Sequence, residues 1–201
     1  MKKTLCSLAV LSLLTSASAF AHKEGDFIVR AGLASVVPND DSSEELGAKL
    51  EVDSDTQLGL TFGYMFTDNV SFEVLAASPF KHDISVQGAG KAGETKHLPP
   101  TFMLQYYFGT AESDFRPYVG AGINYTFFFD EKLDSGASLS LDDSWGLAAN
   151  VGLDYMLNDD WFVGGSIWYA DIDTTATIGG TTNVDVEIDP WVLMISGGYK
   201  F

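Results

Sequence analysis

The feature that most constrains this chain is a two-residue alternation of bulky apolar side chains with small or polar ones. It is clearest over residues 57–66, 144–156 and 191–201. A period of two is the side-chain period of a β-strand. After residue 21, no apolar run approaches the roughly 20 residues that a membrane-spanning helix needs. The sequence therefore excludes an α-helical membrane protein and predicts a chain built from strands.

Less regular alternation brings the predicted number of strands to eight. The segments are 27–36, 57–66, 70–77, 101–108, 116–128, 144–156, 161–172 and 191–201. Soluble barrels alternate too, so side-chain size must decide which face points inward. The lumen of an eight-stranded barrel only just holds packed side chains, so the glycine-rich face fits inside and the bulky apolar face must look outward, where lipid accepts it. We predict an all-β fold, an eight-stranded antiparallel transmembrane β-barrel.

The predicted connections alternate in length, as in a barrel inserted from one side. Short turns at 67–69, 109–115 and 157–160 are expected in the periplasm with both chain ends, and long extracellular loops span 37–55, 78–98, 129–142 and 173–187. The long loops carry much of the negative charge, at Asp40, Asp41, Glu44, Glu45, Asp130, Glu131, Asp134, Asp173 and Asp185.

Aromatic residues gather near both boundaries of the predicted membrane-spanning wall, as in a membrane girdle. They are Phe66, Phe108, Trp161, Tyr199 and Phe201 on the periplasmic side and Trp145, Tyr169 and Trp191 on the outer side. A soluble sandwich with scattered core aromatics is the alternative.

The chain begins like an exported protein. Lys2 and Lys3 precede an apolar run at 5–14 and a small-x-small site at 19–21, so we expect residues 1–21 to be a cleaved signal peptide and 22–201 a single barrel domain. Cys6 lies in the leader, so the mature chain would lack disulfides and cysteine nucleophiles. The leader holds two lysines and no acid, so its loss takes the net charge from −17 to −19, which argues against a nucleic-acid partner. The aromatic last residue is typical of strands that outer-membrane assembly machinery recognises.

Charged residues occupy the inward positions near the predicted periplasmic end. Buried charges are tolerated only when they are paired and hydrogen-bonded, so we expect this group to close the lower lumen. This predicted polar plug consists of Arg30, Glu73, Gln105, Arg116, Asp154 and Lys200.

Farther up the strands, the inward positions become apolar. They are Leu75, Met103, Phe128, Trp168, Val192 and Met194. These side chains either fill the barrel as a packed core or line a dry cavity, open to the outside, for a small apolar molecule. Conduction of ions or sugars is disfavoured, because water-filled lumens belong to much larger barrels.

No catalytic or cofactor motif is recognisable. No nucleophile motif surrounds any serine, and His82 and His97, at the ends of one long loop, are expected to be solvated. Two histidines with nearby acids also fit a metal site, but their spacing is not specific. We predict a protein without enzymatic activity, metal or cofactor.

Five segments of the chain are informative when they are taken together: 56–65 (TQLGLTFGYM), 97–101 (HLPPT), 115–126 (FRPYVGAGINYT), 171–176 (DIDTTA) and 189–192 (DPWV). With these segments the chain resembles the outer-membrane protein W family. The resemblance covers essentially the whole mature chain. It implies a Gram-negative outer-membrane barrel with a hydrophobic internal channel for small hydrophobic compounds, which Leu75 and Trp168 would border.

Two functions follow as hypotheses. In the first, a small hydrophobic ligand or a detergent tail enters the apolar upper lumen, is stopped by the polar plug and leaves sideways into the outer-membrane lipids. In the second, the barrel is a packed scaffold whose acidic loops serve as a receptor for ions, phage or bacteriocins. An enzymatic role in lipid modification would instead require His82 or His97 for turnover.

Overall fold

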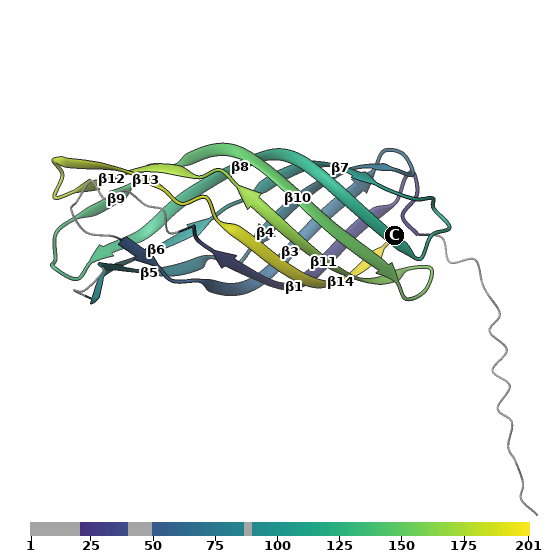
Figure 1. Cartoon of the computed structure of the whole chain (residues 1–201), viewed down its shortest axis with the longest axis horizontal. Helices are drawn as coiled ribbons and strands as arrows, with labels where there is room; N and C mark the ends of the chain where they lie inside the picture. Colours follow the sequence, from purple (N-terminus) through teal and green to yellow (C-terminus); the bar gives the residue numbers. More distant parts are fainter. Residues whose placement is uncertain (1–20, 40–49, 87–89) are drawn as a thin grey trace, which may run out of the picture.

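The computed structural model describes residues 21–39, 50–86 and 90–201 and shows a closed antiparallel barrel (Figure 1). Its walls are β1 (Phe27–Val37), β3 (Asp55–Met65), β4 (Val70–Ala77), β7 (Thr101–Tyr107), β8 (Phe115–Leu133), β10 (Ser144–Met156), β11 (Trp161–Ala170) and β14 (Trp191–Lys200). Each pairs with its neighbour along the chain, and β14 closes the barrel on β1. The predicted eight-stranded barrel is confirmed. The predicted leader lies outside the described residues apart from Ala21.

Within the described residues, no helix is long and apolar enough to cross a membrane.

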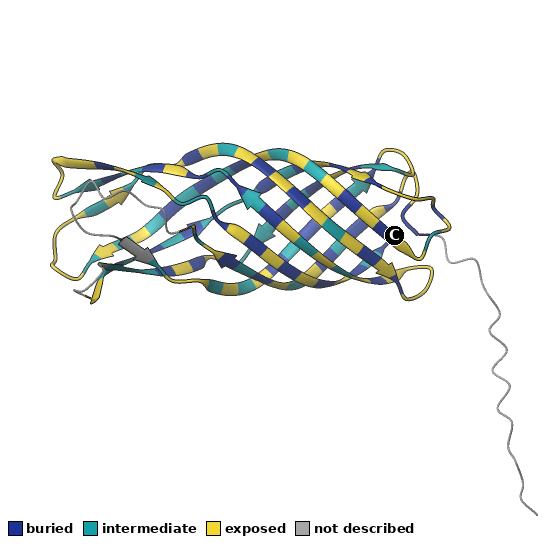
Figure 2. Cartoon of the chain, in the orientation of Figure 1, coloured by how far each residue is buried: buried dark blue, intermediate teal, exposed yellow. Residues whose placement is uncertain are grey.

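The two faces of the wall alternate in exposure as the sequence indicated. Buried and exposed residues alternate along every wall strand (Figure 2). Bulky apolar residues are on the outside, with Leu147 70% and Ile195 78% exposed. An outer surface of this composition is stable only against lipid.

Aromatic side chains pair near both ends of the wall. At the end with the chain termini, the ring of Tyr199 lies 4.9 Å from that of Trp161 and 4.7 Å from that of Phe201. At the other end, Tyr169 and Trp191 lie 5.3 Å apart. These pairs occupy the predicted girdle positions.

Two inward glycines leave room for large rings in the narrow lumen. A Cβ at Gly152 would collide with the ring of Tyr118, and one at Gly198 would collide with the ring of Phe162. The glycine-rich face therefore lets aromatic side chains cross the lower lumen without widening the barrel.

The predicted long connections are present, and most of their described residues extend the β-structure beyond the membrane. The added strands are β2 (Leu50–Val52), β5 (Phe80–Val86), β6 (Gly90–Leu98), β9 (Leu139–Leu141), β12 (Asp173–Ile178) and β13 (Thr182–Glu187). β8 also runs on to Leu133 and pairs there with β6. Backbone polar groups outside the membrane thus pair with each other. The predicted acids Asp40, Asp41, Glu44 and Glu45 lie outside the described residues.

These strands form two separate groups at the end opposite the termini (Figure 1). One group continues the barrel sheet in the order β8-β6-β5-β2, and the other is a small sheet in the order β13-β12-β9. No hydrogen-bonded ladder joins the two groups within the described ranges. The wall is therefore continuous around the barrel but divided above it.

Candidate ligand site

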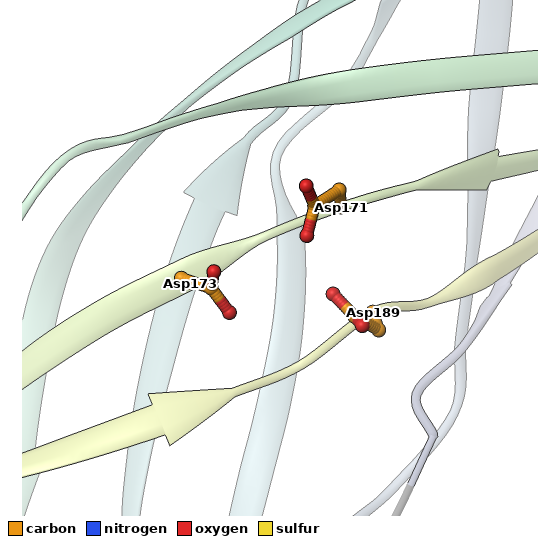
Figure 3. Close-up of side chains that lie close together, drawn as sticks. All are labelled: Asp171, Asp173 and Asp189. Atoms are coloured by element: carbon orange, nitrogen blue, oxygen red, sulfur yellow. The ribbon is translucent and has the colours of Figure 1, made fainter.

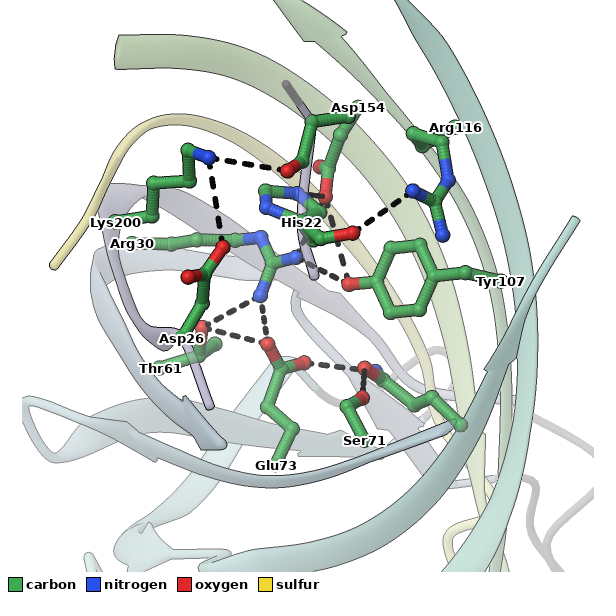
Figure 4. A network of polar contacts seen from close by, with 12 residues as sticks. His22, Asp26, Arg30, Thr61, Ser71, Glu73, Tyr107, Arg116, Asp154 and Lys200 are labelled. Carbon is green, nitrogen blue, oxygen red and sulfur yellow. Dashed lines mark hydrogen bonds and ion pairs between the residues drawn. The ribbon is translucent and has the colours of Figure 1, made fainter. Parts of the chain in front are cut away.

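Arg30 of β1 is the centre of the polar plug (Figure 4). Its guanidinium donates to Glu73 of β4 and, at 2.7 Å, to Asp154 of β10. It also donates to the hydroxyls of Tyr107 and Thr61. Arg30 is 3% exposed and Asp154 is fully buried. One arginine thus joins carboxylates from opposite walls, and this pairing makes their burial tolerable.

Two other residues of the predicted polar plug lie in the lower lumen as well. Gln105 donates to Glu73 at 2.8 Å from the neighbouring strand β7. Lys200 lies 3.4 Å from the carboxylate of Asp26. All are buried, and Gln105 extends the network of Arg30 to β7, whereas Lys200 and Asp26 form a separate ion pair in the same region.

Arg116 occupies the same region but has different partners. It donates to the backbone carbonyls of His22 at 2.9 Å, Thr110 at 3.1 Å and Asp68. Within the described part of the chain, it makes no ion pair with a carboxylate. Arg116 therefore ties the periplasmic turns to the segment before β1.

Sequence reasoning missed His22 as a member of the polar plug. His22 is fully buried, and its Nε2 lies 2.8 Å from Asp154. Its ring contacts those of Tyr107 and Phe162 at centroid distances of 5.4 and 4.7 Å. It precedes the first strand, so no alternation indicated that it folds into the lumen.

Above the polar plug, five of the six predicted pocket residues form a packed layer. Leu75, Met103, Trp168, Val192 and Met194 pack with one another and with small residues of β1 and β10. The space left beside Leu75, Trp168 and Val192 is only about 20 Å³, about the size of one water molecule. This middle layer fills the barrel, so the larger space lies elsewhere.

A larger cavity, of about 200 Å³, lies between the two strand groups above the middle layer. From the barrel sheet it is lined by Val52, His82, Ile84, Ala92, Thr95, His97, Phe128 and Leu133. From the small sheet it is lined by Leu139, Leu141, Thr174, Ala176, Ile178, Val184, Val186 and Glu187, and Pro38, Asn39 and Ile188 complete the lining. Phe128 is the sixth predicted pocket residue and the one that reaches this upper cavity. The lining is almost entirely apolar, which suits an apolar ligand.

The expectation that His82 and His97 are solvated is wrong. They are 3% and 4% exposed, and their rings stack at a centroid distance of 5.0 Å with 10° between the planes. His97 also contacts the rings of Phe80 and Phe128. Burial lowers the pKa of His82, and burial together with the neighbouring His82 lowers the pKa of His97 to about 3. Both rings are therefore neutral at neutral pH. The strands β5 and β6 hold them against the cavity.

Three aspartates lie together at the outer end of the wall (Figure 3). Oxygen atoms of Asp171, Asp173 and Asp189 all lie within 4.8 Å of one another. Partial burial and the two neighbouring carboxylates raise the pKa of Asp173. Asp189 already accepts hydrogen bonds from Tyr169 and from the backbone of Ile172. Its carboxylate thus anchors the junction between β11 and the small sheet.

Comparison with known proteins decides the family of this barrel. The model of the OmpW family matches residues 23–201. The chain belongs to the OmpW family. This OmpW-family barrel is 65% identical to outer membrane protein W of Vibrio cholerae serotype O1 over 217 residues, covering 100% of both chains. It is therefore an integral protein of the outer membrane.

Two further relatives of this OmpW-family barrel bear on its structure and function. It is similar to the crystal structure of OprG from Pseudomonas aeruginosa, with a TM-score of 0.83 and 50% identity over 90% of this chain and 98% of OprG. It is 27% identical to the dibenzothiophene metabolism operon protein PahQ of Pseudomonas aeruginosa over 214 residues, which cover 100% of this chain and 99% of PahQ. The similarity spans the whole OmpW-family barrel, including the strands that build the upper cavity.

Proposed function

We propose that this OmpW-family barrel binds small apolar molecules in the upper cavity and passes them on toward the membrane. The observation that carries the proposal is the change in lumen chemistry with height. The upper cavity is walled by aliphatic and aromatic side chains, whereas the polar plug holds buried, paired charges. An apolar molecule gains free energy on entering the cavity and loses it on approaching the charges.

The polar plug makes a straight path to the periplasm unfavourable. Passage would require an apolar molecule to separate Arg30 from Glu73 and Asp154, which leaves charges unpaired in a dry lumen. The division of the wall into two strand groups above the barrel offers a less costly exit. We therefore propose lateral exit between these groups, toward the outer-membrane lipids.

The name of one relative supports a role in handling apolar compounds. The name of PahQ links that protein to the metabolism of dibenzothiophene, an apolar aromatic compound. We propose that the present chain handles molecules of similar polarity.

A cavity-filling variant tests the proposed site. Ala176 of β12 is buried and lines the upper cavity, whereas the next residue, Thr175, is half-exposed on the opposite face of the strand. We expect Ala176→Phe to lower naphthalene uptake by cells at least about fivefold, because a phenyl group takes much of the cavity, and Thr175→Phe to leave it unchanged. Equal uptake by both variants, at equal protein levels in the outer membrane, would rule out the cavity as the binding site.

The order in which a ligand arrives tests lateral exit. With the protein in liposomes, pyrene applied from outside should reach the lipid, where it forms excimers, before it reaches a quencher enclosed inside. Simultaneous arrival, or arrival at the quencher first, would instead support passage through the polar plug.

The receptor function remains a second candidate, because exposed acids surround the outer end. Described examples are Asp134, Asp142, Asp143 and Asp173. Deleting 78–98 would remove β5 and β6 together with one wall of the cavity, so it does not separate the two functions. Replacing the four acids by asparagine separates the two functions, because it leaves the cavity walls in place. Loss of phage or bacteriocin sensitivity with normal naphthalene uptake would support the receptor function alone.

The route to the membrane is also a proposal. We propose that residues 1–21 are removed on export and that the assembly machinery recognises β14 with Phe201, whose ring is 73% exposed. N-terminal sequencing of protein from the outer membrane should begin at His22. Phe201→Ala should lower the amount of folded barrel in the membrane, and an unchanged amount would contradict the role of this residue.

A further inference from the structure

The upper cavity is apolar, but one of its lining residues carries an unused hydrogen-bond acceptor. Nδ1 of His82 lies 2.6 Å from the backbone carbonyl of Asp53. A carbonyl can only accept, so Nδ1 carries the proton and Nε2 of the neutral ring has a bare lone pair. No described residue forms a hydrogen bond with this buried Nε2. An unsatisfied buried acceptor is costly and is a feature that calls for an explanation.

The surroundings of His82 keep this acceptor bare. His97 stacks on its ring at a centroid distance of 5.0 Å. The carboxylates of Asp53 and Asp55 are the charged groups that act on His82. Burial outweighs their attraction and lowers its pKa, so the ring stays unprotonated at neutral pH.

The two threonine hydroxyls that line the same cavity already donate their protons to backbone carbonyls. Thr174 donates to the backbone carbonyl of Asp142 at 2.6 Å, and Thr95 donates to that of Lys96 at 3.5 Å. Ile84 and Val184 also line the cavity and offer no polar group, whereas Asn39 and Glu187 line it from exposed positions. In the buried part of the lining, His82 therefore carries the acceptor that has no partner in the described part of the chain.

We propose that the upper cavity selects apolar molecules that carry one hydroxyl group, such as phenols and alcohols, and that Nε2 of His82 accepts the hydroxyl proton in a hydrogen bond. This inference rests on the proposed function, because it uses the same cavity as the binding site. The apolar walls bind the carbon skeleton of a phenol and of its parent hydrocarbon alike. The acceptor adds an interaction that the hydrocarbon lacks, and water is largely excluded from competing for it.

Nuclear magnetic resonance on the mature protein in lipid nanodiscs tests this inference with p-cresol and toluene, which differ by one hydroxyl group. The chain contains three histidines, so a sample with ¹⁵N-labelled histidine gives a simple ring spectrum. Labelled methyl groups of Ile84 and Val184 report occupation of the cavity. We expect both ligands to shift the methyl signals, but only p-cresol to move the Nε2 signal of His82 toward that of a hydrogen-bonded nitrogen.

Two variants measure how much the acceptor contributes to selectivity. His82→Phe keeps an aromatic ring in the stack and removes the acceptor, and we expect the ratio of p-cresol affinity to toluene affinity to fall about tenfold. His97→Phe is the matched control, because it keeps the acceptor of His82, and the ratio should change less than about twofold. If His82→Phe does not fold, the ring spectrum of the wild-type protein still decides.

The outcomes separate this inference from the proposed function. If neither ligand shifts the methyl signals, the cavity is not a binding site and both proposals fail. If both ligands shift them while the Nε2 signal stays in place, the cavity binds apolar molecules but His82 does not select among them. An ordered water that holds Nε2 would give this second result and would overturn the inference.

Discussion

The lower and upper parts of the lumen have different walls and are filled in opposite ways. In the polar plug, Arg30 joins Glu73 and Asp154, and buried charges occupy the lumen. Above the middle layer, aliphatic side chains from two strand groups face each other across about 200 Å³ of space. The lower part lies inside the continuous barrel wall, whereas the upper part lies between two strand groups that no hydrogen-bonded ladder joins within the described ranges. The chemistry of the lumen therefore changes together with the wall that surrounds it.

The charged network of the lower part and the empty space of the upper part also have different consequences for the stability of the barrel. A charged network stabilises the barrel only while it is complete, because each partner becomes an unpaired buried charge when the other is removed. A cavity weakens its walls, since lining atoms lack contacts on one side. The polar plug should therefore be sensitive to single changes, and the upper walls should tolerate them.

The largest expected effect is at the centre of the polar plug. Arg30→Met leaves Glu73 and Asp154 buried without their shared partner, and we expect the free energy of unfolding to fall by about 3–5 kcal/mol. Urea unfolding in lipid vesicles, followed by tryptophan fluorescence, measures it. The triple variant with Glu73→Gln and Asp154→Asn removes the charges as well and should regain most of the loss. A midpoint for Arg30→Met equal to that of the wild-type protein would mean that the ion pairs do not stabilise the barrel.

The next largest loss of stability is expected in the middle layer, and it should exceed the loss in the wall of the upper cavity. Trp168 is buried among packed side chains, so Trp168→Ala should lower the free energy of unfolding by roughly 3 kcal/mol. Leu141 is half-exposed and lines the cavity, so Leu141→Ala should cost roughly 1 kcal/mol. Equal losses in the same urea assay would show that the cavity walls are as tightly packed as the middle layer.

The wall and the polar plug could be predicted from sequence because both depend on local rules. A period of two fixed which residues share a face, and the size of those residues fixed which face meets lipid. The inward positions then followed one by one, so Arg30, Glu73 and Asp154 were placed together without knowledge of their contacts. The strand pairing needed only that neighbours in sequence be neighbours in the barrel.

The upper cavity could not be predicted, because it depends on contacts between segments far apart in the chain. His82 and His97 are buried since β5 and β6 pair with each other and with the extension of β8, and since the small sheet lies opposite. Alternation is weak in those segments, so they resembled loops. The packing of Leu75 against Trp168 likewise depends on how volumes fit across the lumen, which a pattern of faces does not give.

The upper region should also be the part of the protein that moderately acidic pH destabilises. Burial, followed by the influence of His82, lowers the pKa of His97 from 6.5 to about 3 in the folded protein. Between these values the unfolded segment binds a proton that the folded segment does not, so stability is full above pH 6.5 and falls as the pH drops toward 3. At pH 5, we expect opening of β6, seen by amide hydrogen exchange and corrected for intrinsic rates, to be roughly thirtyfold more frequent than at pH 7.5.

His97→Phe is the control for this pH dependence and should make it much weaker. Hydrogen bonds from Lys81 and Lys91 lower the pKa of Glu94, on the same strand, from 4.5 to about 2. Its contribution is lost only as the pH falls below about 4.5, so a comparison at pH 5 separates it from the histidine. The same acceleration in the variant as in the wild-type protein would assign the effect to another group.

The smallest effect is expected at an ion pair that has the same chemistry as the polar plug but lies in solvent. Nζ of Lys96 lies 3.0 Å from the carboxylate of Asp130, and the two side chains are 39% and 55% exposed. Water and salt screen this pair, so Lys96→Met should leave the urea midpoint unchanged within error at 0.15 M salt. A loss as large as that of Arg30→Met would mean that burial does not distinguish the two pairs. An unchanged midpoint, beside a large loss at Arg30, would show that the stability of the polar plug comes from charges that solvent does not reach.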